Sequence, residues 1–131
     1  MQKEMWVSIL AHQLKGIMFH ADAYGVACLH GYKRLKMAHC KQEREESNTF
    51  MVTRCKSIEH LGEIIDIPPI TRIAVPHTAS PSEIAEMWLK WEMETAELYS
   101  KAMIENPECK MWIELHKSAT DEIRYISRMH F

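Results

Sequence analysis

Apolar residues recur along the first part of the chain with the period of an α-helix. They step by three and four positions, through Val7, Leu10, Leu14, Ile17, Ala21, Tyr24 and Cys28. A stripe of this kind is typical of helices that pack side by side in a bundle. We therefore predict a helix over residues 3–29 whose stripe faces a helical neighbour.

The pair His30-Gly31 marks a break between this helix and the next. A single helix over residues 3–61 would be about 90 Å long, because each residue adds about 1.5 Å, and that is too long for a domain of this size. We predict a second helix over residues 32–62. Its two ends carry apolar residues, whereas residues 42–49 in its middle are almost wholly polar.

Residues 63–80 are predicted to form a long irregular connection. Pro68, Pro69 and Pro76 lie in it, and a segment with this density of proline cannot remain helical. Ser80 then suits the N-cap of a third helix, which is expected over residues 81–105.

The third and fourth helices also carry apolar stripes. The third stripe runs through Ile84, Trp88, Trp91, Thr95, Leu98 and Ala102. The pair Asn106-Pro107 ends that helix, and a fourth is expected over residues 108–129. Its stripe runs through Trp112, Leu115, Ala119, Glu122, Ile126 and Met129.

The pattern of connections predicts one all-α domain over residues 1–131, folded as a four-helix bundle. The connections are short, long and short, and the long one lies between the second and third helices. One long crossover of this kind is typical of ferritin-like bundles. The alternative is a disordered tether that joins two separate helical hairpins.

Composition excludes several classes of function. The net charge of −2 provides no basic surface for nucleic acid, and no apolar run is long enough to cross a membrane. His12, Gln13 and Lys15 interrupt the first apolar stretch, so we do not expect a signal peptide. The four cysteines form no CxxC pair and indicate reduced thiols in the cytoplasm. The chain has no nucleophile elbow or phosphate-binding loop, which argues against a hydrolase.

Acidic residues at expected core positions are the candidate chemistry. Glu122 falls on the stripe of the fourth helix, where a buried carboxylate needs a metal ion, a basic side chain or a shared proton. In the second helix His39, Glu43 and Glu46 share one face, although the same residues also fit a solvated charge run. Glu92 flanks the stripe of the third helix.

The first helix offers His20 in place of an acid. Carboxylate and imidazole ligands suit iron or manganese, and also zinc. Di-iron bundles use a Glu-x-x-His motif on two of their helices, and the sequence contains no such motif. A histidine in this position is also a common hydrogen-bonded core residue.

The segment Leu89–Tyr99 (LKWEMETAELY) resembles the third helix of the ferritin-like superfamily. By that resemblance Glu92 falls at a metal-binding glutamate, with a tryptophan in place of the usual histidine before it. Glu43 matches a bridging glutamate, and Glu46 stands where the family has histidine. Ile17 replaces the glutamate of the first helix, so that ligand is missing unless His20 substitutes for it.

Two functions follow from these residues. In the first, a divergent ferritin-like protein binds iron or manganese inside the bundle, and oxidative chemistry is conceivable there. Its ligands would be Glu43, Glu46, Glu92, Glu122, His20 and His39. In the alternative, the bundle is a metal-free structural or interaction module, whose acids pair with basic side chains. In either case we expect a homodimer, with Trp88, Trp91 and Trp112 in the pairing surface.

Overall fold

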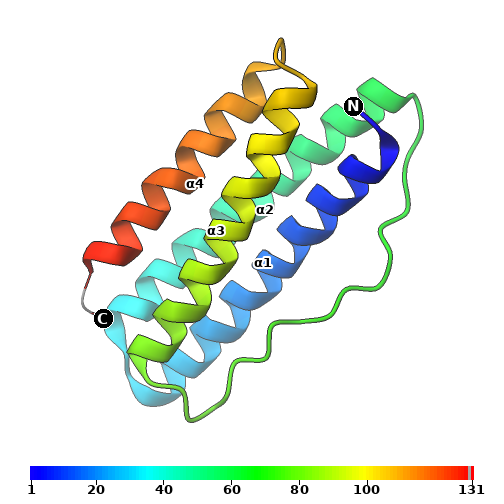
Figure 1. The fold of residues 1–131 in the computed structure, drawn as a ribbon. Coiled ribbons are helices and arrows are strands. Elements are labelled where there is room, and N and C mark those ends of the chain that lie inside the picture. Colours follow the sequence, from blue (N-terminus) through cyan, green and yellow to red (C-terminus); the bar gives the residue numbers. More distant parts are fainter. Residues whose placement is uncertain (130) are drawn as a thin grey trace. The chain divides into compact units, whose positions relative to one another are not determined.

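The computed structural model of the chain describes residues 1–129 and 131. In this part of the chain there are four α-helices and no strand: α1 (Lys3–His30), α2 (Lys33–Leu61), α3 (Pro81–Glu105) and α4 (Lys110–Arg128) (Figure 1). The predicted all-helical class is therefore confirmed, with helix ends close to the predicted ones. The chain divides into two compact units, residues 2–81 and residues 82–131 together with Met1, and each is described by itself.

α1 and α2 form a helical hairpin whose turn depends on Gly31. This residue has φ 71°, in the left-handed region that glycine adopts without strain. The backbone N–H of Tyr32 donates to the carbonyl of Ala27 at 2.9 Å, which closes the end of α1. Gly62 ends α2 with the same φ. The break predicted at His30-Gly31 is confirmed.

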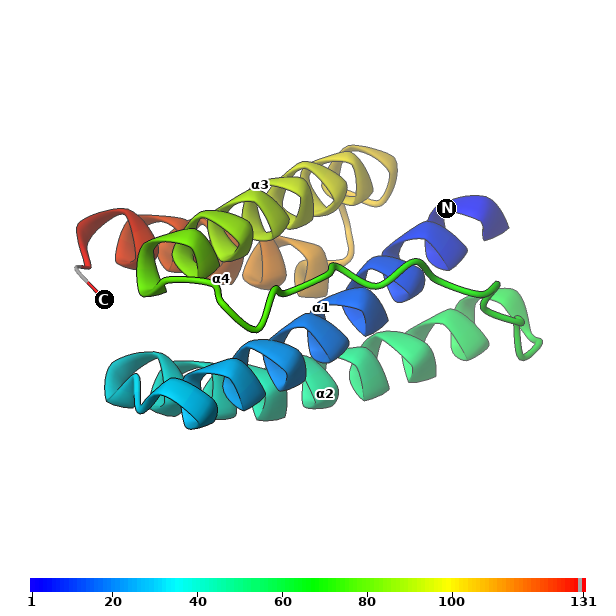
Figure 2. The ribbon, with the colours of Figure 1, turned by 90° about the horizontal axis from the view of Figure 1, so that it is seen from below.

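The connection between α2 and α3, residues 62–80, runs along the hairpin from one end to the other (Figures 1 and 2). At its start Glu63 forms an ion pair of 2.8 Å with Lys3, near the beginning of α1. Near its end the carbonyl of Ala79 accepts a hydrogen bond from the Tyr32 hydroxyl at 3.3 Å, at the hairpin turn. The predicted irregular segment is confirmed, and it spans the length of its own unit.

The buried face of α1 differs from the predicted stripe. Ala21 and Cys28 are exposed, whereas Leu10 is buried as expected. The prediction failed because α1 is apolar on most of its circumference, so the spacing fits more than one face. The buried residues are Trp6, Ile9, Leu10, Gln13, Gly16, Phe19, His20, Ala23, Val26 and Ala27.

In the second unit α3 and α4 contact each other through aromatic rings. Trp88 meets Tyr125 with ring centres 6.1 Å apart, and Tyr99 meets Trp112 at 6.0 Å. The stripe predicted for α3 is buried except at Leu98, whose place Tyr99 takes. Buried aromatic rings contribute large apolar areas to a core.

The tryptophans are not available for a pairing surface, contrary to the prediction. The exposed fractions of Trp88, Trp91 and Trp112 are 0%, 1% and 0%. The prediction assigned these rings to contact with a second copy, but the helices of this chain bury them. Within the described residues no helix is both long and apolar enough to cross a bilayer.

Candidate functional site

Polar side chains occupy the buried faces of α1 and α2, where a hairpin normally carries apolar residues. They are regularly spaced, so they follow one face of each helix. Buried polar groups need hydrogen-bond partners, because an unsatisfied donor or acceptor destabilises the fold. The set is Gln13 and His20 on α1, with His39, Gln42, Thr53 and Ser57 on α2.

His20 and His39 form the centre of this polar set. Both side chains are fully buried, and their Nδ1 atoms lie 2.8 Å apart. Phe19 packs on both imidazoles, with ring centres 5.3 Å from His20 and 5.6 Å from His39. Two histidines predicted as candidate ligands from different helices are therefore brought into direct contact.

The two imidazoles point directly at each other. A ring nitrogen lies about 1.15 Å from its ring centre, so rings that meet head-on at 2.8 Å have centres about 5.1 Å apart. The observed separation of the centres is 5.1 Å. Two imidazoles that ligate one ion at a right angle, with bonds of about 2.0 Å, would bring their centres to about 4.5 Å. The geometry is therefore that of an N–H···N hydrogen bond.

Both imidazoles are neutral at neutral pH. Burial lowers the pKa of His20 well below its usual range, and the neighbouring His39 lowers this pKa further. Burial also lowers the pKa of His39 to about 4. One neutral ring donates its Nδ1–H, and the other accepts with its Nδ1 lone pair. The donor ring then carries its lone pair on Nε2.

A second buried hydrogen bond joins the helices at Gln13. Its Nε2 donates to Oγ1 of Thr53 at 3.0 Å, and the Thr53 hydroxyl donates to the backbone carbonyl of Thr49 at 2.8 Å. Both side chains are fully buried. The hairpin is therefore held by polar pairs as well as by apolar packing.

The structure places the predicted carboxylates in different surroundings. Glu43 is half-buried and accepts a hydrogen bond of 3.2 Å from the Ser47 hydroxyl, one turn further along α2. Glu46 is half-buried and lies seven residues after His39, on the same face. In the other unit, Glu92 on α3 is 2% exposed and Glu122 on α4 is half-buried.

Among the residues that the structure describes, no group of three or more His, Cys, Asp or Glu side chains is arranged to hold a metal ion. The assignment of the six candidate ligands stays a prediction. Gln13, Gln42, Thr53 and Ser57 were not predicted as members of the polar set. The available signal was a spacing of seven residues between Gln13 and His20, and of fourteen between His39 and Thr53.

Comparisons with models of protein families, with curated proteins and with solved structures gave no match to the chain.

Proposed function

We propose that the chain is a ferritin-like helical module that works as a structural or interaction protein and does not depend on a bound metal. Its four helices would form a four-helix bundle with a crossover between α2 and α3. The course of residues 62–80 supports this topology, because a connection that spans its hairpin returns the chain to the opposite end. The resemblance of residues 89–99 to the third ferritin helix supports the family.

The head-on hydrogen bond between His20 and His39 carries this proposal. Each imidazole directs one nitrogen at the other, and the N–H and the lone pair of these nitrogens are used in the contact. Coordination of a metal through these Nδ1 atoms would require removing the proton of the hydrogen bond and turning both rings in a packed core. The pair is therefore best understood as a polar contact that fixes the register of α1 on α2.

Metal binding is the second candidate, and the tautomers of the pair favour it. A histidine that donates from Nδ1 carries an Nε2 lone pair, which is the form that ligates metals when a neighbouring group holds the other nitrogen. In this reading one of His20 and His39 is a ligand and the other orients it. Carboxylates from the set Glu43, Glu46, Glu92 and Glu122 would complete an iron or manganese site.

A metal titration distinguishes the two functions. The full chain is stripped of metal and then titrated with Fe²⁺ and with Mn²⁺ under anaerobic conditions, beside His20→Gln and a control, His116→Gln on α4. The module proposal expects no stoichiometric binding in any of the three proteins. One equivalent bound to the wild type and the control, but not to His20→Gln, would reject the module and support the metal site.

Assembly and compartment also belong to this proposal. Met37 and Met51 on α2 are 74% and 65% exposed, and they would contribute to a homodimer surface. Cys28 and Cys55 are exposed free thiols, which persist in a reducing compartment such as the cytoplasm. Sedimentation of the purified chain tests the dimer, and a monomer at all concentrations would exclude it.

A further inference from the structure

A pocket of about 480 Å³ lies along the first half of α2, beside one side chain of α1. A volume of this size accommodates a small organic molecule. All of the lining residues belong to one compact unit, and three of them are cationic while one is acidic, which gives the lining a net charge of +2. They are Tyr24, Lys36, Met37, Cys40, Lys41, Arg44 and Glu45.

The one carboxylate of the lining, Glu45, is held by two neighbours on its own helix. Its Oε1 forms an ion pair of 3.8 Å with Nζ of Lys41, and its Oε2 accepts a hydrogen bond of 3.4 Å from Nε2 of Gln42. Side chains three and four residues apart are neighbours on a helix, so both contacts are local. Glu45 therefore offsets the charge of Lys41 and not that of the other two cations.

The other two cations, Lys36 and Arg44, are exposed, and neither forms an ion pair with any residue that the structure describes. The positions three and four residues before and after each of them on α2 contain no acid. The pocket thus has two positive charges that no carboxylate of the chain compensates.

The middle of the pocket is mainly apolar. The side chain of Met37 is 74% exposed there, and Cys40 lies between the two cations in sequence. Tyr24 of α1 contributes its ring, and a hydrogen bond with the Cys28 side chain raises the pKa of its phenol. The ring therefore stays protonated at neutral pH and adds no negative charge.

The spacing of the two cations suits a ligand with a charge at each end. Lys36 and Arg44 lie eight residues apart on α2, which is about 12 Å along the helix axis. A hydrogen bond of about 2.9 Å to each cation leaves about 6 Å between them for the ligand. A chain of six carbons that ends in two carboxylates has about this length between its carboxyl carbons.

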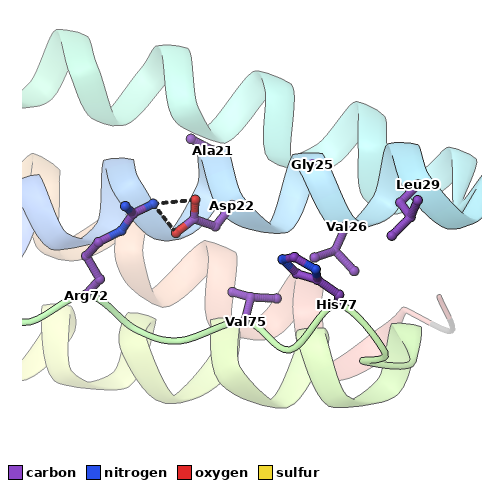
Figure 3. A pocket seen from close by; sticks show the side chains of 8 residues that line it. All are labelled: Ala21, Asp22, Gly25, Val26, Leu29, Arg72, Val75 and His77. Atoms are coloured by element: carbon purple, nitrogen blue, oxygen red, sulfur yellow. Dashed lines mark hydrogen bonds and ion pairs between the residues drawn. The ribbon is translucent and has the colours of Figure 1, made fainter.

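The pocket shown in Figure 3, between α1 and the connection after α2, lacks this excess of positive charge. There Nη2 of Arg72 donates to both carboxylate oxygens of Asp22 at 2.6 Å, so the pair has no net charge. The backbone amides of Gly25 and Val75, which line that pocket, are an internal reference for a charged probe.

We propose that the pocket along α2 binds a small aliphatic dicarboxylate whose two charges lie at opposite ends of an apolar chain. One carboxylate binds the Lys36 ammonium, and the other accepts two parallel hydrogen bonds from one edge of the Arg44 guanidinium. The methylene groups lie over Met37 and the ring of Tyr24. The site uses neither His20 nor His39, so its failure would leave the proposed function in place.

The first test compares three probes at neutral pH by NMR of the ¹⁵N-labelled full chain. Adipate has six carbons and two charges, hexanoate has the same length and one charge, and malonate has two charges and no apolar chain. We expect adipate to shift the amides of Met37 and Lys41 in a saturable way and those of Gly25 and Val75 not at all. Hexanoate and malonate should bind at least about threefold more weakly, because each loses one part of the contact. Equal affinity of adipate and hexanoate, or no saturable shift with adipate, would overturn the proposal.

The second test removes the two cations one at a time. Lys36→Gln and Arg44→Gln change exposed side chains, so the fold should be retained. We expect each variant to bind adipate at least about threefold more weakly and no better than it binds hexanoate. Lys56→Gln, at an exposed position of α2 outside the pocket, makes the same change in net charge and should bind as the wild type does. Equal losses in all three variants would reject this site.

Met37 also belongs to the proposed homodimer surface, so sedimentation of the same samples reports the oligomeric state with and without adipate. Saturable adipate binding that Lys36→Gln and Arg44→Gln weaken supports the pocket in a monomer and in a dimer alike. A chain that binds no adipate in either state would overturn the pocket and leave the dimer in place.

Discussion

Gln13 on α1 donates a hydrogen bond of 3.0 Å to the Thr53 hydroxyl on α2, and both side chains are fully buried. This pair lies on the same buried faces as His20 and His39. The interface between α1 and α2 therefore contains two separate polar contacts, and each forms only when its two partners lie opposite each other. Such contacts contribute to specificity of register more than to net stability, because a shifted register leaves buried polar groups unpaired.

Thr53→Val tests the contact with Gln13. Valine keeps the shape of threonine and removes the acceptor, so the buried amide loses a partner, and we expect a loss of about 1–2 kcal/mol in the free energy of unfolding. Urea unfolding measures it. The control is Thr120→Val on α4, which also removes a hydroxyl bonded to its own helix, there to the carbonyl of Lys117. Similar losses in both variants would show that the contact with Gln13 contributes nothing.

The histidine pair predicts a coupling between two substitutions. His39→Leu leaves the buried ring of His20 without its hydrogen bond from α2, and we expect a loss of about 2–3 kcal/mol. The double substitution His20→Leu with His39→Leu removes both polar rings, so it should cost less than the sum of the two single changes. Equilibrium unfolding of the four proteins measures the coupling. Strict additivity would mean that the rings do not depend on each other.

Stability should fall as pH falls below the ordinary histidine pKa. An unfolded histidine binds a proton near pH 6.5, whereas burial lowers the pKa of folded His39 to about 4. The unfolded state therefore binds more protons in this window, and the stability present above pH 6.5 is lost as pH decreases towards 4. The loss approaches about 1.4 kcal/mol per pH unit for each buried histidine.

Urea unfolding between pH 7.5 and 5.5 measures this dependence before most carboxylates titrate. The variant with leucine at both positions 20 and 39 should show a shallower decrease than the wild type. Equal slopes in the two proteins would contradict the assignment of two neutral buried imidazoles.

Two glycines provide a matched test of backbone effects. Gly25 lies inside α1 with open space around its Cα, so Gly25→Ala should stabilise the chain by about 0.5–1 kcal/mol. Gly31 has φ 71° at the hairpin turn, so Gly31→Ala should destabilise it by about 1 kcal/mol or more. Thermal unfolding compares them. Changes of the same sign would contradict the described turn.

The bounds of the helices could be predicted from the sequence, because the residues that begin and end them are distinctive. Few other helix boundaries are compatible with Gly31, Gly62 and the pairs Ser80-Pro81 and Asn106-Pro107. The buried face of α1 could not be predicted in the same way, because the apolar residues of this helix are distributed around most of its circumference. The stripe of α3 could be predicted because the exposed face of this helix is mostly polar, apart from Met93 and Ile104.

The candidate site was predictable only in part. His20 and His39 were recognised as unusual residues on core-facing positions, but their contact depends on the register of two helices that are far apart in sequence. A change of one residue in the contacting positions turns a side chain by about 100° around its helix, which would separate the two rings. Gln13 and Thr53 were missed for the same reason, since neither is exceptional without its partner.

The most direct test of the account is the scalar coupling across the hydrogen bond between the Nδ1 atoms of His20 and His39, measured by ¹⁵N NMR. The protein is stripped of metal, and the measurement is repeated after one equivalent of Zn²⁺ and, separately, of Fe²⁺ has been added without oxygen. The account predicts a measurable coupling between the two Nδ1 atoms that both metals leave unchanged. A stoichiometric shift of the imidazole resonances, with or without loss of the coupling, would contradict it and identify the pair as part of a metal site, because a metal bound at Nε2 leaves the contact between the Nδ1 atoms in place.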